Sequence, residues 1–485
     1  MSSSFERVAM AGAATGTGPA GERGRLARLA PVLAGAAAVV CALGWLQKQP
    51  CASAKFDFIK TTTRACYTDV YPLYYVRGLN DGKVPYFDSF TGSDIHHVEY
   101  PVLSGGFMQL VAWLVRPFGV DERGMAFYNV TALLLAVLAV VAVLATAYAA
   151  GRRSLRAGLM VALSPSLLLT AYINWDLLAV ALSALALAAW SSRRPALAGA
   201  LLGLAVAAKF YPLLFLGPLV LLCVRAGRWR AMGRMLAGTA GAWLVVNVPV
   251  MVFAWDGWVE FYSFSQKRGI DWGSIFFVLQ DHGLSDVAAD TDQLNLAGTG
   301  TFLVLAAGIA VLALAAPRRP RLPQLMFLVL VAFMLPNKVW SPQYVLWLLP
   351  LAVLARPKLP AFLVWQVGEI LYFFGIWWYL LSVSLQVPGS DLSSTLSAAL
   401  HLDAPEGGIS QDVYTIALLA RFVTVLAMAV LVVWDVLRPS GDIVRTGGED
   451  DPAGGVLDGV DDVVSLRRWR GARHLRTGAA AAPAG

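Results

Sequence analysis

The sequence has few charged residues, few cysteines and few histidines. Charged side chains make up 14% of the 485 residues, against about a quarter in an average soluble domain, while 58% of the residues are hydrophobic. This composition excludes an ordinary soluble protein and indicates a chain with many membrane spans. The net charge of +7 comes largely from arginines that flank hydrophobic runs, as is typical of cytoplasmic loops. We therefore expect membrane lipids as partners and no nucleic acid.

The arginine clusters predict how the spans are oriented, because basic loops of membrane proteins stay in the cytoplasm. Placing every cluster inside puts both termini in the cytoplasm of a multi-pass plasma-membrane protein. A cleaved signal peptide is the alternative interpretation of the first apolar run. The twelve predicted spans are 29–46, 126–149, 157–172, 177–190, 196–208, 212–224, 235–253, 297–316, 324–336, 343–355, 360–382 and 413–436.

The predicted fold is therefore all-α, a polytopic transmembrane helical bundle. It has a cytoplasmic N-terminal tail at 1–28 and a membrane domain at 29–437. The polar, Gly-rich segment 438–485 reads as a disordered cytoplasmic tail. A long first external loop, about residues 47–125, carries interfacial helices, because the apolar segment Pro101 to Phe118 cannot cross without reversing the later arginines.

Several predicted helices are too short for a bilayer. Helices of 13 to 16 residues reach about 20 to 24 Å, against a hydrocarbon core of roughly 30 Å. Their external turns, at 172–176, 209–212 and 337–343, are then expected below the outer surface. Irregular backbone at that depth is tolerated where it lines a cavity. We expect a polar cavity that opens to the outer leaflet beneath the first loop.

The first loop carries a carboxylate that suits a general base. Asp69 and Tyr71 stand at the head of an amphipathic segment in which Leu73, Val76 and Leu79 recur at three-residue steps. A carboxylate at the membrane interface can take a proton from an acceptor hydroxyl. The structural alternative is that Asp69 caps this helix.

Further polar residues fall at the cavity turns or lead into an apolar helix. Ionisable groups at membrane depth default to a functional hypothesis, and a lysine suits a phosphate. The alternatives are that Lys209 snorkels or pairs with Asp176, that Glu99 begins a helix, and that the turn at 337–343 satisfies its own backbone. These candidate binding residues are Glu99, Tyr100, Asn174, Asp176, Lys209, Tyr211, Asn337, Lys338, Ser341 and Gln343.

The four cysteines and five histidines offer little to a metal. The adjacent pair His96 and His97 is a weak signal, and we expect no metal and no cofactor. Cys51 and Cys66 both fall in the first external loop, an oxidising location. We predict that they form a disulfide that holds Asp69 against the membrane.

Three stretches resemble glycosyltransferase family 87 of the GT-C superfamily, whose members use polyprenyl-phosphate sugars. They are Asn174-Trp175-Asp176-Leu177, the run from Leu201 to Pro212, and Trp340-Ser341-Pro342-Gln343-Tyr344. Thr68-Asp69-Val70-Tyr71 and Glu99-Tyr100-Pro101 resemble the first loop of that superfamily. The resemblance implies a GT-C fold and a cell-envelope hexosyltransferase, with mannose as the expected sugar.

By this resemblance, Asp69 is the catalytic base and Lys209 holds the donor phosphate, with Lys338 or Arg77 as further cations. GT-C enzymes often pair two acidic residues in this loop, which leaves Glu99 and Asp94 as candidates for the second. The expected reaction is an inverting transfer to a lipid or glycan acceptor on the extracytoplasmic face. The alternatives are a transporter or flippase of lipid-linked sugars and a non-catalytic scaffold.

Overall fold

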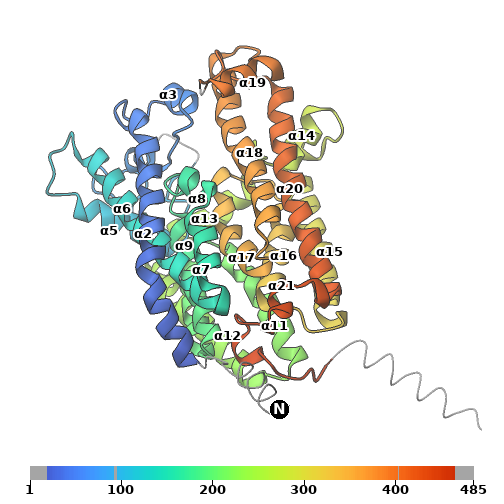
Figure 1. The fold of residues 1–485 in the computed structure, drawn as a ribbon. Helices are drawn as coiled ribbons and strands as arrows, with labels where there is room; N and C mark the ends of the chain where they lie inside the picture. The colour runs from blue at the N-terminus through green and yellow to red at the C-terminus, as the bar shows by residue number, and fades with distance from the viewer. Residues whose placement is uncertain (1–18, 92–94, 402, 465–485) are drawn as a thin grey trace, which may run out of the picture.

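The computed structural model describes all residues except 1–18, 92–94, 402 and 465–485, and it is a bundle of helices (Figure 1). The described residues contain no strand, only an isolated bridge between Ser390 and Ile409. The all-α prediction is confirmed. Within the described residues, six helices are long and apolar enough to cross a membrane: α2 (Pro19–Ala52), α6 (Arg123–Ala149), α12 (Trp229–Phe253), α15 (Thr291–Ala315), α18 (Leu359–Leu385) and α20 (Gln411–Leu437).

Shorter helices fill the centre between these long ones. The predicted span 157–172 is broken at Ser164 and Pro165, because proline favours a helix start and not an interior. α16 and α17 are buried along nearly their whole length. The short elements are α7 (Ser154–Ala162), α8 (Pro165–Thr170), α9 (Asp176–Ser191), α10 (Pro195–Ala208), η2 (Tyr211–Phe215), α11 (Leu216–Arg225), α16 (Leu322–Met334), η4 (Pro342–Tyr344) and α17 (Val345–Ala355).

Small residues allow the closest helix contact, between α10 and α12. A Cβ atom at Gly199 would lie 2.0 Å from the carbonyl oxygen of Met235, and one at Gly203 would lie 2.3 Å from that of Thr239. Glycines four residues apart let two backbones approach in this way in membrane helices. The two helices are therefore held at a fixed mutual position.

The first loop folds over one end of the bundle. It contains α3 (Phe58–Thr63), α4 (Val70–Val76) and α5 (Val102–Leu114). With 13 residues, α5 reaches about 20 Å, short of a bilayer. Its failure to cross remains a prediction. The other loop elements are α13 (Trp255–Lys267), α14 (Ile275–Asp281), η3 (Val287–Ala289) and α19 (Leu392–Leu400).

The prediction that residues from 438 onward are disordered is wrong for 438–464. This segment forms η5 (Pro439–Gly441), α21 (Ile443–Thr446) and η6 (Gly455–Leu457) against the opposite end of the bundle. Buried ion pairs hold it, among them Arg321 Nε to Asp442 Oδ2 at 2.7 Å. Its acidic residues match arginines far away in the sequence, which composition cannot show. Residues 465–485 lie outside the described part of the chain, as does most of the predicted N-terminal tail.

Candidate active site

A cavity of about 610 Å³ lies under the first loop, where the predicted turns converge. Segments from many parts of the chain form its wall: α3, the stretch before α4, the stretch before α5, the turns before α9 and after α10, the loops around α13 and η4, and part of α18 (Leu359–Leu385). Seven of the candidate residues line it: Asp69, Glu99, Tyr100, Asn174, Lys209, Ser341 and Gln343. The expected polar cavity is therefore present.

Asp69 does not cap α4 through its side chain, although it occupies the position before the first helical residue. Its carboxylate instead accepts hydrogen bonds from the Tyr67 hydroxyl at 2.7 Å and from Asn174 Nδ2 at 2.9 Å. The hydroxyl of Thr68 accepts the hydrogen bond from Val70 N at 3.1 Å. The helix-capping alternative for Asp69 is therefore wrong.

The backbone around Asp69 is tied to the turn before α9. Asp69 N donates to the carbonyl of Ile173 at 2.7 Å, and the Thr68 hydroxyl donates to that of Tyr172 at 2.6 Å. Asn174 Nδ2 also lies 2.8 Å from the Tyr100 hydroxyl. The loop and the membrane bundle thus present one continuous hydrogen-bonded surface to the cavity.

Burial raises the pKa of Asp69 above its ordinary value of 3.8, and the hydrogen bonds from Tyr67 and Asn174 oppose that rise. The charge of Lys209 also lowers it. The negative charge of Asp69 in turn raises the pKa of Tyr67 well above 10, so that this hydroxyl stays a donor. Asp69 is therefore a carboxylate more basic than one in water.

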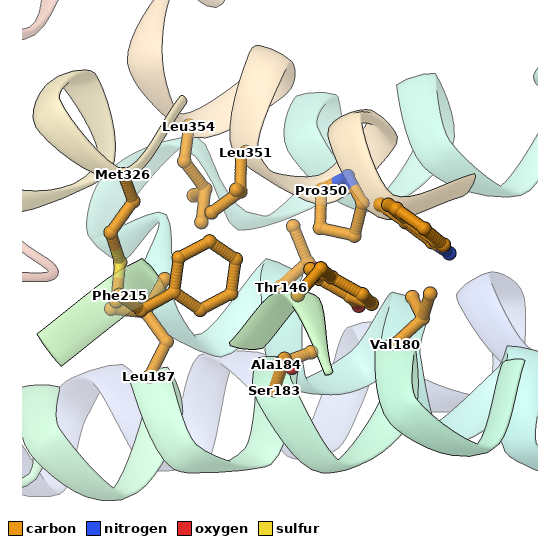
Figure 2. A pocket seen from close by; sticks show the side chains of 12 residues that line it. Thr146, Val180, Ser183, Ala184, Leu187, Phe215, Met326, Pro350, Leu351 and Leu354 are labelled. Carbon is orange, nitrogen blue, oxygen red and sulfur yellow. The ribbon is translucent and has the colours of Figure 1, made fainter. Parts of the chain in front are cut away.

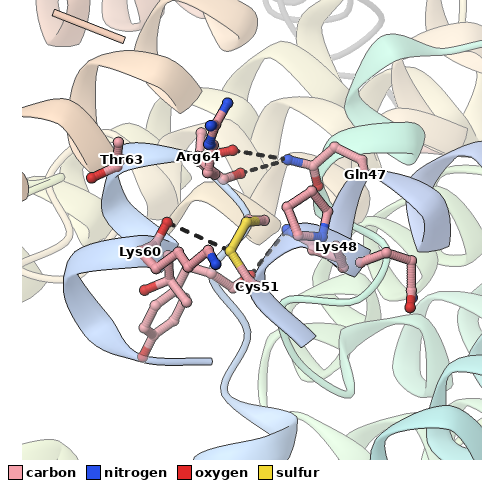
Figure 3. The surroundings of a disulfide bond; sticks show 12 residues. Gln47, Lys48, Cys51, Lys60, Thr63 and Arg64 are labelled. Atoms are coloured by element: carbon pink, nitrogen blue, oxygen red, sulfur yellow. Dashed lines mark hydrogen bonds between the residues drawn. A yellow bond between two sulfur atoms is a disulfide. The ribbon is translucent and has the colours of Figure 1, made fainter. Parts of the chain in front are cut away.

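The disulfide between Cys51 and Cys66 is present, with a Cα–Cα distance of 6.1 Å, and the prediction is confirmed. It joins the end of α2 to the segment that leads to Asp69. Figure 3 shows the surrounding hydrogen bonds, including that from Gln47 Nε2 to Ala65 O at 2.8 Å. The buried Lys48 Nζ also donates to Tyr67 O at 3.0 Å. These links position residues 65–67, directly before Thr68 and Asp69.

Two other carboxylates line the cavity, and both face a cation. Glu99 accepts two hydrogen bonds from Arg77, at 2.8 and 2.5 Å. Asp271 lies 3.4 Å from Arg268 and accepts a hydrogen bond from the Ser341 hydroxyl at 3.2 Å. Among the cavity carboxylates, Asp69 alone accepts hydrogen bonds only from neutral side chains. It is the one best suited to receive a proton.

Lys209 brings a positive charge to the same cavity. Its Nζ lies 3.4 Å from Asp176, whose carboxylate also accepts a hydrogen bond from Trp347 Nε1 at 2.6 Å. The ammonium lies 5.5 to 5.8 Å from the ring centres of Tyr100, Tyr344 and Trp347. The predicted pairing of Lys209 with Asp176 is present, yet Lys209 still lines the cavity while Asp176 is buried beneath it.

A second cavity of about 340 Å³ adjoins the first and shares Lys209 and Arg268 with it. Aromatic side chains of α13 form much of its lining, and Tyr211, Asn337 and Lys338 also contribute. Lys338 Nζ donates to Asn295 Oδ1 at 2.6 Å, and burial lowers its pKa. Together, the two adjoining cavities therefore have a polar part around Asp69 and a more apolar part beyond Lys209.

Three predicted site residues lie outside both cavities: Tyr71, Arg77 and the buried Asp176. Tyr71 is buried against Phe56 and Tyr75, with ring centres 5.4 and 5.3 Å apart. Arg77 is held by Glu99 and by the Phe90 ring, 5.1 Å away. The prediction that Arg77 faces the phosphate therefore does not fit, because its guanidinium is already used in folding the loop. Asp94, the other candidate for a second carboxylate, lies outside the described residues.

Sequence reasoning missed Tyr67, Arg268, Asp271 and Tyr344, which all line the main cavity. Tyr67 precedes Asp69 by two residues, and its position could have drawn notice. Arg268 and Asp271 lie in a connection between α13 and α14 that carries no recognisable pattern. Only the packing of that connection against the turn at 337–343, where Asp271 N donates to Lys338 O at 2.8 Å, brings them into the site.

A third cavity, deeper in the bundle, is too small for a substrate (Figure 2). Its volume is about 20 Å³, enough for one water molecule. Most of its wall is apolar, and Thr146 and Ser183 are among the few polar side chains there. The described residues contain no group of three or more His, Cys, Asp or Glu side chains that could hold a metal ion.

Comparison with known proteins gives one family. The model of glycosyltransferase family 87 matches residues 100–337, about half of the chain. No curated protein matches the sequence. Among solved structures, the chain is similar to the apo form of the oligosaccharyltransferase of Archaeoglobus fulgidus, with a TM-score of 0.36 and 14% identity. The match covers 91% of this chain and 57% of that structure.

Proposed function

The chain belongs to glycosyltransferase family 87 and is a membrane glycosyltransferase, and from this premise we propose that it moves a hexose from a polyprenyl-phosphate sugar to a hydroxyl acceptor. The sugar we propose is mannose, and the acceptor is a lipid or glycan at the extracytoplasmic face of the plasma membrane. We also propose that both termini are cytoplasmic. The observation that carries the proposal is Asp69, a half-buried carboxylate bound only by neutral donors in a cavity that also holds Lys209.

In the proposed reaction, Asp69 takes the proton from the acceptor hydroxyl. The hydroxyl oxygen then attacks the anomeric carbon, and the bond from that carbon to the phosphate oxygen breaks. The lipid phosphate leaves with the bonding electron pair, and a single attack of this kind inverts the anomeric centre. Proton removal by a positioned base contributes typically 10²- to 10⁴-fold in rate.

The leaving phosphate needs positive charge where its own charge develops. Lys209 and Arg268 line both the main cavity and the adjoining one. We place the donor phosphate between them, with Lys338 nearby, and no metal is required in this arrangement. The aromatic lining beyond Lys209 suits the first apolar units of the polyprenyl chain. The acceptor then occupies the space beside Asp69, Glu99 and Tyr100.

The test uses the purified protein in liposomes with radiolabelled polyprenyl-phosphate mannose and candidate lipid and glycan acceptors. Label that appears in an acceptor supports the proposal, and the α or β configuration of the product reports inversion. A second arm follows movement of the labelled donor between leaflets without transfer. Movement alone, with no transfer to any acceptor, would favour a flippase and overturn the proposal.

A further inference from the structure

A cavity of about 620 Å³ lies at the end of the bundle opposite Asp69 and is lined by four arginines. Helix α10 begins beside this cavity at Pro195 and ends at Ala208, next to Lys209, so the two cavities lie at opposite ends of one helix. The arginines come from the turn before α10 and from the start of α12. They are Arg193, Arg228, Arg230 and Arg234.

Among the residues that the structure describes, these arginines lack the carboxylate partners that other arginines at this end have. Arg225 and Arg319 share Asp462 at 2.7 and 2.9 Å, and Arg321 pairs with Asp442. Within the part of the chain that the structure describes, no carboxylate pairs with any of the four cavity arginines. Asp458 is the one acidic residue in the lining, so the charge of the described lining is +3 from four arginines and one aspartate.

The backbone also favours a role for Arg193 beyond that of a connector. It has φ of 60°, a left-handed conformation that ends α9 and usually falls to glycine. Its N–H donates to Trp190 O at 2.8 Å, in the pattern of a helix end. Arg193 therefore combines a strained backbone with a side chain that forms no ion pair within the described residues, and strained positions gather at functional sites.

The position of the cavity relative to α12 indicates what fills it. The outer face of α12 is exposed and apolar from Leu236 to Phe253. The 19 residues that separate Arg234 from Phe253 span about 29 Å, close to the hydrocarbon thickness of a bilayer. Arg230 and Arg234 therefore lie at headgroup depth, beside Trp229, which is 54% exposed. Tryptophan is enriched at this level of membranes.

We propose that this cavity binds the phosphate headgroup of an anionic phospholipid from the surrounding leaflet. The close contact of α10 with α12 at Gly199 and Gly203 holds the two helix starts together, so the arginines converge in a preformed site. The tail residues Val456 and Val460 form the wall on the other side. The guanidinium groups supply bidentate donors to phosphate oxygens, and the acyl chains lie along the apolar face of α12.

The test measures binding of dioctanoyl phosphatidylglycerol to the purified full-length protein in detergent, by native mass spectrometry and by the rise in Tm on titration. Dioctanoyl phosphatidylcholine and inorganic phosphate are titrated in parallel. We expect tight binding and a rise in Tm with phosphatidylglycerol alone. Equal effects of phosphatidylcholine, or of phosphate without a lipid, would overturn the assignment to an anionic lipid.

A matched pair of variants locates the site. The double variant Arg230→Gln/Arg234→Gln should weaken phosphatidylglycerol binding by roughly tenfold or more, since each cation near an anionic headgroup contributes substantially. The control Arg156→Gln/Arg438→Gln removes the same charge from exposed arginines at the same end but outside the cavity. Its binding should remain within about twofold of the parent. Equal losses in both variants, or no loss in the first, would refute the site.

Folding of the variants is checked by their Tm without lipid. Should the glutamine variant prove unstable, Arg230→Lys/Arg234→Lys keeps the charge and loses the bidentate geometry. Partial weakening in the lysine variant supports a built phosphate site. Full retention of binding would show attraction by charge alone and contradict the proposal.

Discussion

The two ends of the bundle both carry buried or half-buried charges, yet they arrange them differently. Under the first loop, Asp69 and Lys209 face a cavity of about 610 Å³. At the tail end, Arg321 meets Asp442 with side chains 2% and 1% exposed, and the Arg321 guanidinium also donates to the carbonyls of Leu354 and Ala355. Charges beside open space can meet a substrate, while charges closed on each other hold segments together.

The comparison predicts its largest effect at Asp69. Asp69→Asn should reduce transfer by roughly 10²- to 10⁴-fold, because the amide keeps the shape and cannot accept a proton at neutral pH. Stability should hold, since no helix-capping bond is lost. The matched control is Asp271→Asn, the same change in a carboxylate of the same cavity that already faces Arg268. Transfer rates and Tm are measured for both, and a larger loss at 271 would reverse the assignment.

At the end of the bundle that carries residues 438–464, a substitution should reduce stability and not the rate of transfer. Arg321→Ala leaves Asp442 buried without its partner, and breaking a buried pair costs about 3 to 5 kcal/mol. The control is Arg318→Ala, because Arg318 pairs with Asp450 while 55% exposed, and such a pair contributes at most about 1 kcal/mol. Denaturation measures the difference. A fall in kcat of folded Arg321→Ala protein, out of proportion to its stability, would contradict the division of roles.

The disulfide should affect both the stability of the protein and the position of Asp69. Removing it by Cys51→Ser/Cys66→Ser should cost on the order of 3 kcal/mol for a closed loop of this length, and the cysteines are 15 residues apart. Transfer should fall too, since Asp69 follows Cys66 by three residues. Cys223→Ala, a change in a free buried cysteine, serves as the control and should keep transfer. Intact transfer without the disulfide would show that hydrogen bonds alone position Asp69.

Lys209 both faces the cavity and pairs with a buried carboxylate. Its variants should separate the effect on transfer from the effect on stability. Lys209→Ala should raise the KM for the donor by roughly 10- to 100-fold, the effect of a lost hydrogen bond to a charged group. It should also lower Tm, because Asp176 stays buried with only the Trp347 hydrogen bond. Adding Asp176→Asn should recover Tm but not the KM. Recovery of both would reduce Lys209 to a structural partner.

The smallest expected effect is on the pH profile. Asp69 must be ionised to act, so transfer should fall as pH drops through its folded pKa, which burial raises above 3.8. Tyr67→Phe removes a hydrogen bond that favours the ionised form, so the midpoint of kcat/KM should move to higher pH. Because the folded pKa is raised, ionised Asp69 opposes folding, and stability should decline as pH rises from 3.8 through the folded pKa. Asp69→Asn should lack that decline.

Much of the site could be predicted from local patterns. Asp69 and Lys209 stood out as charged residues beside short apolar helices, where a charge is costly without a purpose. The turns at 172–176, 209–212 and 337–343 were expected to meet because the helices before them are too short for a bilayer. The structure brings residues of all three turns to one cavity. Arg77 was misjudged because its partner, Glu99, is 22 residues away.

Composition and periodicity by themselves determined that this protein is an all-α membrane protein with a long first loop, because a bilayer admits few ways to satisfy the backbone. Only the tertiary structure decided which charged side chains pair with each other and which line a cavity. The tail at 438–464 looks disordered in sequence, yet its aspartates meet arginines more than 100 residues away. Arg268 and Asp271 entered the site in the same way. Pairing between distant charges depends on where the packed helices carry them, and no local pattern records that position.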